Sequence, residues 1–116
     1  MARIPVPGTP VRGSKSGSPI MALFDLLGRR WAMGVVWILS ERGPCTFGQL
    51  ETACETISPA VLNTRLKELV AAGLVVKQDN GYGVSKLGRE VYASLLPLSA
   101  TSRKWAALFA PRAPGV

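Results

Sequence analysis

Two helical segments follow one another in the middle of the sequence with almost no chain between them. The first begins at Thr46, a favoured N-cap residue, and runs to about Cys54. The second begins at Ser58-Pro59, a cap followed by proline, and runs to Gly73. Only residues 55–57 separate the two segments, and so short a link is typical of a helix-turn-helix. The apolar side chains expected to face inward are Phe47, Leu50 and Cys54 in the first helix and Leu62, Leu66, Leu69 and Val70 in the second.

The pattern changes directly after the second of these helices. Leu74-Val75-Val76-Lys77 is apolar and β-branched, Asp79-Asn80-Gly81 is a hairpin-turn signal, and Tyr82-Gly83-Val84 reads as a second short strand. A helix-turn-helix followed by a small hairpin is a winged helix. The sequence therefore predicts a mainly α fold with a small β-hairpin, a winged helix-turn-helix.

Three further helices are expected around this unit. Ser18-Pro19 caps the first, which ends at Gly28, and the second ends at Gly43-Pro44. Ser85 caps the third, which Pro97 is expected to kink or split. Their inward stripes are expected to be Ile20, Leu23, Phe24 and Leu27, then Trp31, Val35, Ile38 and Leu39, then Leu87, Val91 and Leu95.

The ends of the chain lack this periodicity. Residues 1–17 hold three prolines and three glycines, and they are predicted to form a flexible basic arm carrying Arg3, Arg12 and Lys15. Such an arm either tracks the minor groove of DNA or is a solvated tail. Residues 18–109 are expected to form one domain for DNA binding and dimerisation, and residues 110–116 a frayed tail.

Composition narrows the function. The chain has no histidine and only two cysteines, which argues against zinc sites of the usual ligand sets, histidine-dependent triads and a disulfide framework. We therefore expect no enzyme activity and no cofactor. No secretion signal and no membrane-spanning run are recognisable, so a cytoplasmic protein without membrane contact is expected.

The charge of the chain points to a polyanionic partner. Fourteen Lys and Arg stand against seven Asp and Glu, a formal net charge of +7. The excess is not in the predicted helix-turn-helix, because residues 44–73 carry two basic and three acidic side chains, a net of −1. It lies in the arm, at Arg29-Arg30 between the first two helices, and near the C-terminus. Arg30 is expected either to reach a phosphate or to pair with a carboxylate.

Five stretches of the sequence resemble the HxlR-type winged-helix regulators, relatives of the MarR group. The resemblance covers about residues 18–109 and implies a homodimer that binds a pseudo-palindromic operator. It also implies a dimer interface formed by the first helix and the C-terminal helices. The matching stretches are Leu26-Leu27-Gly28-Arg29-Arg30-Trp31, Phe47-Gly48-Gln49-Leu50, Ile57-Ser58-Pro59-Ala60-Val61-Leu62-Asn63-Thr64-Arg65-Leu66, Leu69-Val70-Ala71-Ala72-Gly73-Leu74-Val75 and Leu87-Gly88-Arg89-Glu90.

The sequence departs from the family pattern at three places. Ser18 stands where oxidant-sensing members carry a cysteine, and Thr46 replaces a frequent arginine, which removes a phosphate contact. The wing is shorter than usual, and its tip at residues 79–81 carries no positive charge, which weakens the expected grip on the minor groove.

The second helix of the helix-turn-helix is expected to enter the major groove. On its outward face Asn63 can pair with adenine, Thr64 can bond a base or touch a thymine methyl, and Ala60 and Val61 can meet such methyls. Ser58, Arg65 and Lys67 suit phosphates. The alternative is an ordinary solvated helix face. The predicted DNA-binding residues are Ser58, Ala60, Val61, Asn63, Thr64, Arg65, Lys67 and Lys77.

The remaining conspicuous side chains have structural interpretations. Trp31 and Cys54 are expected in the core, and Cys45 lies before a helix N-terminus, where a thiolate is favoured. The C-terminal apolar stripe exceeds what so small a domain can bury, which indicates a dimer contact. We expect a dimeric, sequence-specific DNA-binding transcription regulator whose small-molecule effector, if any, is unspecified. The alternative is a winged-helix protein-interaction module that has lost DNA binding. The stripe consists of Leu95, Leu98, Trp105, Leu108 and Phe109.

Overall fold

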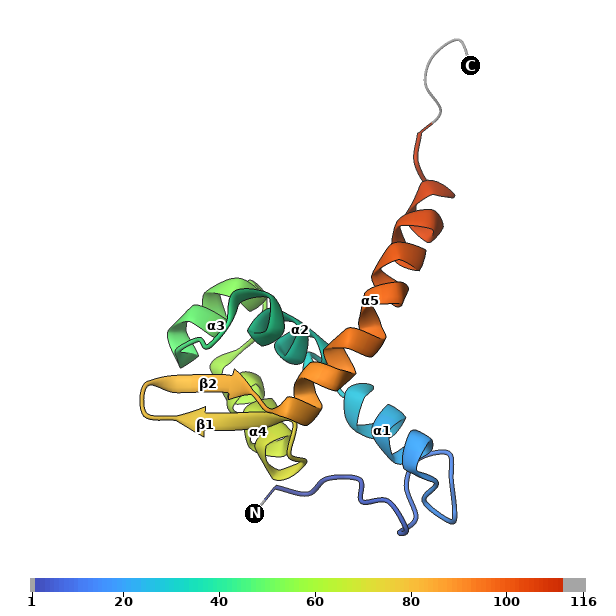
Figure 1. Cartoon of the computed structure of the whole chain (residues 1–116), viewed down its shortest axis with the longest axis vertical. Helices are drawn as coiled ribbons and strands as arrows, with labels where there is room; N and C mark the ends of the chain where they lie inside the picture. The colour runs from blue at the N-terminus through green and yellow to red at the C-terminus, as the bar shows by residue number, and fades with distance from the viewer. Residues whose placement is uncertain (1, 112–116) are drawn as a thin grey trace.

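The structure, a computed structural model, describes residues 2–111. These residues form five helices and one hairpin, and the last turns of the fifth helix project from the body that the other elements form (Figure 1). The elements are α1 (Pro19–Leu27), α2 (Ala32–Arg42), α3 (Phe47–Cys54), α4 (Pro59–Ala71), β1 (Val75–Gln78), β2 (Gly81–Val84) and α5 (Lys86–Ala107). The order α2, α3, α4, β1, β2 is that of a winged helix-turn-helix, and the predicted fold class is confirmed.

Side-chain caps fix where three of the helices begin. The Ser58 hydroxyl accepts from the backbone N–H of Val61, and the Ser85 hydroxyl accepts from Gly88. At α3, Thr46 and Gln49 form a reciprocal capping box. These local bonds explain why the starts of α3, α4 and α5 were predictable from sequence.

The hairpin is joined to the helix-turn-helix by backbone hydrogen bonds. β1 and β2 pair antiparallel with Gln78 opposite Gly81, so Asp79 and Asn80 form the turn and Gly81 belongs to the strand. Cys45, just before α3, exchanges two backbone hydrogen bonds with Tyr82, of 2.9 and 2.8 Å. A Cβ on Gly81 would lie 2.2 Å from the Cys45 carbonyl oxygen, so this approach requires glycine.

The core lies between α2, α3, α4 and the base of the hairpin, and the predicted leucines of α3 and α4 are buried in it. The predicted inward positions are wrong for one or two residues in each of three helices. Ile20 and Phe24 of α1 are more than half exposed, because α1 packs instead through the face formed by Ala22, Leu26 and Leu27. Val70 of α4 and Leu87 of α5 are also exposed. The apolar periodicity therefore identified the packed side of α4 apart from Val70, but in α1 it included two residues that are exposed to solvent.

Trp31 is packed against the core but lies outside the helix that it was expected to begin. It is the N-cap residue of α2, half-buried, and its backbone is left-handed with a φ of 71°. The chain between α1 and α2 consequently turns sharply at Trp31. This turn directs the preceding Arg29 and Arg30 toward α4, with which both make hydrogen bonds.

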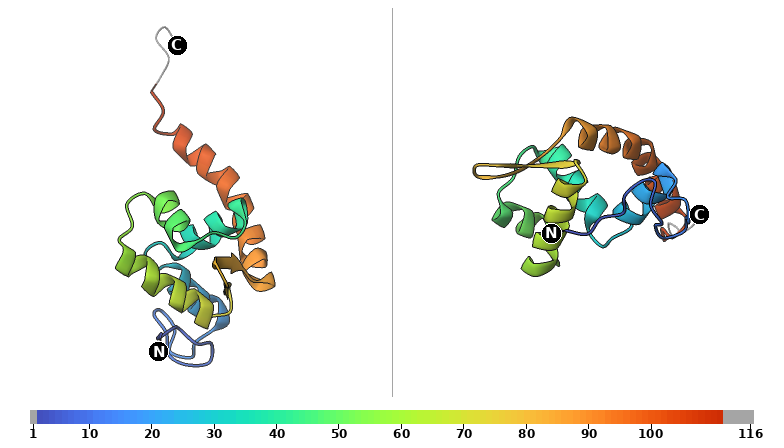
Figure 2. Two further views of the ribbon diagram at one scale, coloured as in Figure 1. Left: turned by 90° about the vertical axis from the view of Figure 1, so that its left-hand side faces the viewer. Right: turned by 90° about the horizontal axis from the view of Figure 1, so that it is seen from below.

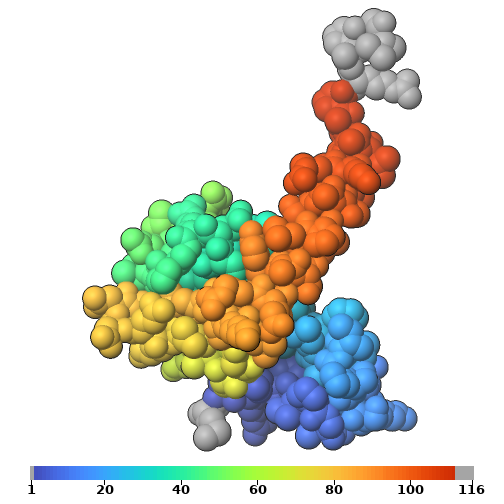
Figure 3. All heavy atoms as spheres, viewed as in Figure 1, coloured from blue at the N-terminus to red at the C-terminus, as the bar shows by residue number. Residues whose placement is uncertain are grey.

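Helix α5 continues through Pro97, so the split is wrong and only the kink remains of the two predicted alternatives. The helix runs unbroken from Lys86 to Ala107. Proline removes a hydrogen bond to the carbonyl one turn earlier, which belongs to Ala93. Ala93 is exposed, so solvent can satisfy that carbonyl. Leu98, Ser99 and Ser102 still line a groove together with residues of α2, and the last turns of the helix project from the body (Figure 3).

The N-terminal segment, residues 2–17, runs along the body beside α1 and α4 (Figures 1 and 2). Gly8 donates a backbone hydrogen bond to Gly17, and Val11 and Ser14 form a small bridge. The backbone N–H of Arg12 donates to the Asp25 carboxylate of α1 at 3.1 Å. The predicted mobility of this segment stays a prediction. Of the predicted frayed tail, residues 112–116 lie outside the described residues.

Candidate nucleic-acid interface

Helix α4 divides into a buried and an exposed face. Leu62, Leu66 and Leu69 are almost completely buried, whereas Asn63 and Lys67 are exposed. The exposed face also carries Ser58, Ala60 and Thr64, with Val61 half-buried at its margin. Six of the eight residues predicted to contact DNA thus lie together on one side of one helix. The other two are Arg65 and Lys77.

The hydrogen bonds at the start of α4 define what its exposed side chains can still bind. The Ser58 oxygen already accepts the capping bond from Val61 at 3.2 Å, which leaves its hydroxyl hydrogen to be donated. The Thr64 hydroxyl donates to the Ala60 carbonyl at 3.0 Å, so its methyl group and oxygen lone pairs face outward. Ser58 is therefore suited to a phosphate oxygen and Thr64 to a thymine methyl or a base donor.

Helix α4 carries a buried carboxylate, that of Glu68, which forms ion pairs with two arginines. Glu68 is only 8% exposed, and its carboxylate forms ion pairs with Arg29 from the α1–α2 loop and with Arg65 one turn earlier on α4. Arg65 reaches Glu68 at 2.7 Å through Nη1 and donates from Nε to the Arg30 carbonyl at 2.7 Å. Two charge-assisted contacts compensate the burial of the carboxylate. The pairing fastens the α1–α2 loop to α4.

Glu68 was not singled out from the sequence. Its only local signal was the spacing of three residues from Arg65, because the second partner, Arg29, lies 39 residues away in the chain. The pairing also bears on the predicted phosphate contact of Arg65, since Nε and Nη1 are already bonded within the protein. Only Nη2 of Arg65 is without a hydrogen bond inside residues 2–111.

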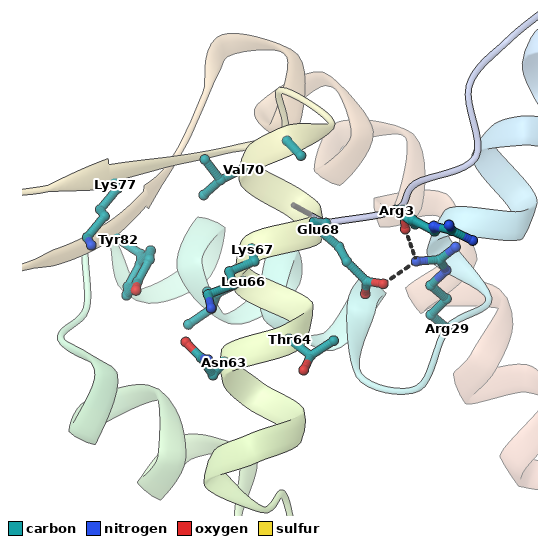
Figure 4. Close-up of a pocket in the computed structure, with 12 residues that line it drawn as sticks. Arg3, Arg29, Asn63, Thr64, Leu66, Lys67, Glu68, Val70, Lys77 and Tyr82 are labelled. Atoms are coloured by element: carbon teal, nitrogen blue, oxygen red, sulfur yellow. Dashed lines mark hydrogen bonds and ion pairs between the residues drawn. The ribbon is translucent and has the colours of Figure 1, made fainter.

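A hollow of about 870 Å³ runs along α4 between the N-terminal segment and the hairpin (Figure 4). Its charged lining consists of four basic residues and one acidic residue, a net of +3. The acidic residue is Glu68, whose charge is offset by its arginine partners. The fold thus places positive charge around a helix-turn-helix that is itself net negative in sequence. The four basic residues are Arg3, Arg29, Lys67 and Lys77.

The wing contributes Lys77 to this hollow. Lys77 is exposed on β1, opposite Tyr82 on β2, and both line the hollow. Figure 4 shows Lys77 and Lys67 on the same side of α4, with Arg3 and Arg29 on the opposite side. The turn at Asp79 and Asn80 is exposed and adds one negative charge. The positively charged side chain of the wing, that of Lys77, therefore lies on strand β1 and not at the turn.

Arg30 lies beside the N-terminus of α4. It lines a small hollow of about 160 Å³ together with Ser58 and Val61, and its side chain is exposed. The sequence left open whether Arg30 pairs with a carboxylate. Within residues 2–111 its side chain forms no salt bridge, and its backbone is held by Arg65. Arg30 is thus available to an anion at the start of α4.

The two thiols are buried and do not line the hollow along α4. Cys54 is buried in the core as predicted, and burial raises the pKa of its thiol. Cys45 is also buried, and its thiol donates to the Gly43 carbonyl at 3.3 Å. Inside residues 2–111 no group of three or more potential metal-ligating side chains occurs. No helix in that part of the chain is long and apolar enough to cross a membrane.

A second exposed surface is apolar and lies at the end of α5. Trp105, Leu108 and Phe109 are 63%, 78% and 72% exposed, and the two aromatic rings meet edge to face at 5.6 Å. Leu98, about two turns earlier, is also exposed, as are Ile20 and Phe24 of α1. A shallow groove of about 340 Å³ between α2 and α5 is lined by Met33, Trp37, Leu95 and Leu98.

Taken together, a winged helix-turn-helix with a polar exposed face on its second helix defines a DNA-binding protein. The profile of the HxlR-like helix-turn-helix family matches residues 26–111, most of the chain. The chain belongs to the HxlR-like helix-turn-helix family, a family of DNA-binding transcription regulators.

Similar proteins agree with this assignment. An HTH-type transcriptional regulator of Halalkalibacterium halodurans is 34% identical over 62 residues, 53% of this chain and 55% of the relative, so the chain spans about half the length of that relative. The HTH-type regulator YdzF of Bacillus subtilis is 27% identical over 95 residues, covering 76% of this chain and 84% of YdzF.

Two solved structures share the fold. A possible HxlR family transcriptional factor from Thermoplasma volcanium superposes with a TM-score of 0.70 at 24% identity, over 78% of this chain and 86% of that one. Quinone-bound YodB from B. subtilis superposes with a TM-score of 0.64 at 29% identity, over 78% of this chain and 97% of YodB. The arrangement of the chain's helices and strands is therefore shared with these two solved proteins.

Proposed function

We propose that this protein is a homodimeric, sequence-specific transcription regulator that occupies a pseudo-palindromic operator. Each protomer inserts α4 into a major groove, and two-fold symmetry presents both helices to one face of the DNA. The observation that carries the proposal is the exposed polar face of α4 beside a hollow lined by four basic residues and one acidic residue. A duplex offers the matching phosphates and base edges.

The exposed residues of α4 divide into those that contact bases and those that contact phosphates. Asn63 pairs with adenine through its amide, and Thr64, Ala60 and Val61 meet methyl groups or base edges. Ser58 and Lys67 bind phosphates, and Lys77 does so from the wing. Arg65 has one terminal nitrogen left for a phosphate, because its other groups hold Glu68 and the Arg30 carbonyl.

Dimerisation explains the exposed apolar surface. Trp105 on α5 is exposed, as are Leu108 and Phe109 directly after that helix and Ile20 and Phe24 on α1. These positions leave more large apolar side chains in water than a monomer of this size normally tolerates. A second copy of the chain covers these faces and sets the distance between the two α4 helices. The half-site centres are then about 34 Å apart, or a multiple of that distance.

The salt dependence of DNA binding tests this function. The protein is titrated against its own upstream DNA and against a random duplex of equal length, between about 50 and 200 mM salt. Displacement of condensed counterions predicts a steep, linear fall of log affinity with log salt on both duplexes. A flat response, or equal affinity for both sequences, contradicts the proposal. The first of these outcomes favours the interaction-module alternative.

A further inference from the structure

We propose that the N-terminal segment is a second DNA-contacting element, docked beside α4 so that Arg3 holds the phosphate backbone next to the groove that α4 enters. The inference rests on the proposed DNA-binding function and extends it to a segment outside the helix-turn-helix. It is carried by three observations: the anchoring of the segment, the place of Arg3, and the distribution of charge.

The first observation is that the segment is held to the body close to Arg3. The Arg3 carbonyl accepts a hydrogen bond of 2.8 Å from Arg29 Nη1, the nitrogen that also pairs with Glu68 of α4. The adjacent Ile4 packs against the hydrophobic core. A polar bond and an apolar contact therefore fix two neighbouring residues relative to the recognition helix, and Figure 4 shows the Arg3 and Glu68 bonds meeting at Arg29.

The next residues of the segment, up to residue 7, lie against the body at a second, apolar hollow. It has a volume of about 280 Å³ and is lined by residues 4–7 on one side and by residues of α1, the end of α4, and Leu74 on the other. Two of the four segment residues are prolines, which have few conformations to lose when the segment docks. Docking therefore costs less conformational entropy than it would for a flexible linker of the same length.

The second observation is where Arg3 lies. Arg3 lines the same hollow as Asn63, Thr64 and Lys67, the candidate base and phosphate contacts of α4. Its side chain is exposed and forms no salt bridge within residues 2–111. In contrast to Arg29 and Arg65, whose charges are directed at Glu68, the charge of Arg3 faces solvent.

The third observation is that the helix-turn-helix needs cations from elsewhere. Residues 44–73 have a net charge of −1, whereas residues 1–17 contain three basic and no acidic side chains. Among those three, Arg3 is the one that lines the hollow along α4. Binding to duplex DNA gains affinity chiefly by neutralising phosphates, so the partner that fits this docked cation is the backbone flanking the α4 groove.

Matched variants of the full chain test the inference. Arg3→Ala removes the proposed contact, and Lys15→Ala is the control, because Lys15 is a basic, exposed residue of the same segment that does not line the hollow. Binding to operator and to random duplex is measured at several salt concentrations. Arg3→Ala should lower the salt slope by about one unit per protomer on both duplexes, with the preference for operator unchanged. Lys15→Ala should leave the slope within error.

A third variant separates a docked segment from a merely charged one. Ile4→Ser weakens the apolar anchor without changing charge, and it should reduce affinity as Arg3→Ala does, while Arg3→Ala should add little in the double variant. Thermal unfolding of each variant checks that the domain stays folded. Equal effects of Arg3→Ala and Lys15→Ala, or no effect of Ile4→Ser in a folded protein, overturn the inference while leaving the proposed function intact. Wild-type protein that binds neither duplex overturns the proposed function itself.

Discussion

Helix α4 exposes one polar face to solvent, whereas the last turns of α5 are exposed on all sides and carry a stripe of the opposite, apolar chemistry. The exposed face of α4 carries an amide, hydroxyl groups and an ammonium group. The exposed end of α5 carries an indole, a phenyl ring and leucines. A polar face of this kind matches the base edges and phosphates of DNA, whereas the apolar face requires burial against protein. The contrast indicates two partners for one small domain.

The two helices also differ in how firmly they are held. α4 is fixed by buried leucines and by the ion pairs of Glu68, so its exposed face has a defined orientation. The last turns of α5 project from the body (Figures 1 and 3), and residues 100–111 are all exposed. A helix that recognises bases must be held in its binding orientation before DNA arrives, because ordering it on binding would cost affinity. A helix that dimerises can instead be held in place by the second copy of the chain.

The largest expected effect is at the apolar face. Trp105→Glu places a charge in the proposed dimer interface and removes an aromatic anchor, so dimerisation should weaken by at least about 30-fold, the equivalent of about 2 kcal/mol. Analytical ultracentrifugation should show monomer or aggregate. Lys104→Glu is the matched control, because it introduces the same carboxylate on the same helix without removing an apolar side chain. A wild-type protein that sediments as a folded monomer contradicts the comparison between the two faces.

The next effect concerns base recognition by α4. Asn63→Ala should cost about 1–3 kcal/mol on the operator and flatten base preference at one position in each half-site, because the amide that pairs with adenine is removed. Affinity for random duplex should change little. Binding-site selection with wild type and variant measures both quantities. An unchanged sequence preference would show that this side chain does not read bases.

A smaller and less selective effect is expected at Lys67. Lys67→Ala should weaken operator and random duplex alike and lower the salt slope by about one unit per protomer, because one phosphate is no longer neutralised. Titrations at several salt concentrations distinguish this result from that of Asn63→Ala. If Asn63, Thr64 and Lys67 can all be replaced by Ala without effect, α4 is not the reader and the interaction-module alternative is favoured.

Features that depend on neighbouring residues could be predicted from the sequence. Ser58 and Thr46 are predictable as caps because a cap acts within three residues, and Leu62 is predictable as inward because it shares helical spacing with Leu66 and Leu69. The contacts of Arg29 were not predictable, because Glu68 lies 39 residues away and Arg3 lies 26 residues away. The positive charge around α4 is therefore a property of the fold.

The prediction of buried residues was wrong where a helix has apolar residues on more than one side. Ile20 and Phe24 share helical spacing with Leu27, but only Leu27 is buried in the chain described. Periodicity measures how apolar residues cluster around a helix and does not say which neighbour covers them. Ile20 and Phe24 both belong to the surface proposed for dimerisation. The two residues that were wrongly predicted to face the core therefore lie where a second copy of the chain is expected.

The smallest expected effect is that of oxidants, because neither exposed face carries a thiol. The resemblance to the family places Ser18 where oxidant-sensing members carry a cysteine, and both cysteines of the chain are buried. The thiolate is the reactive form, and burial raises the pKa of the Cys54 thiol, which lowers its thiolate fraction at neutral pH. Cys45 is 6% exposed and its thiol donates to a backbone carbonyl, so oxidants reach it slowly.

Operator affinity should therefore be unchanged after treatment with diamide or peroxide, with thiol titration as the check that both cysteines remain reduced. Release from DNA on oxidation, abolished by Cys45→Ser, would instead make the loop before α3 a redox switch that acts on the wing through the Cys45–Tyr82 hydrogen bonds.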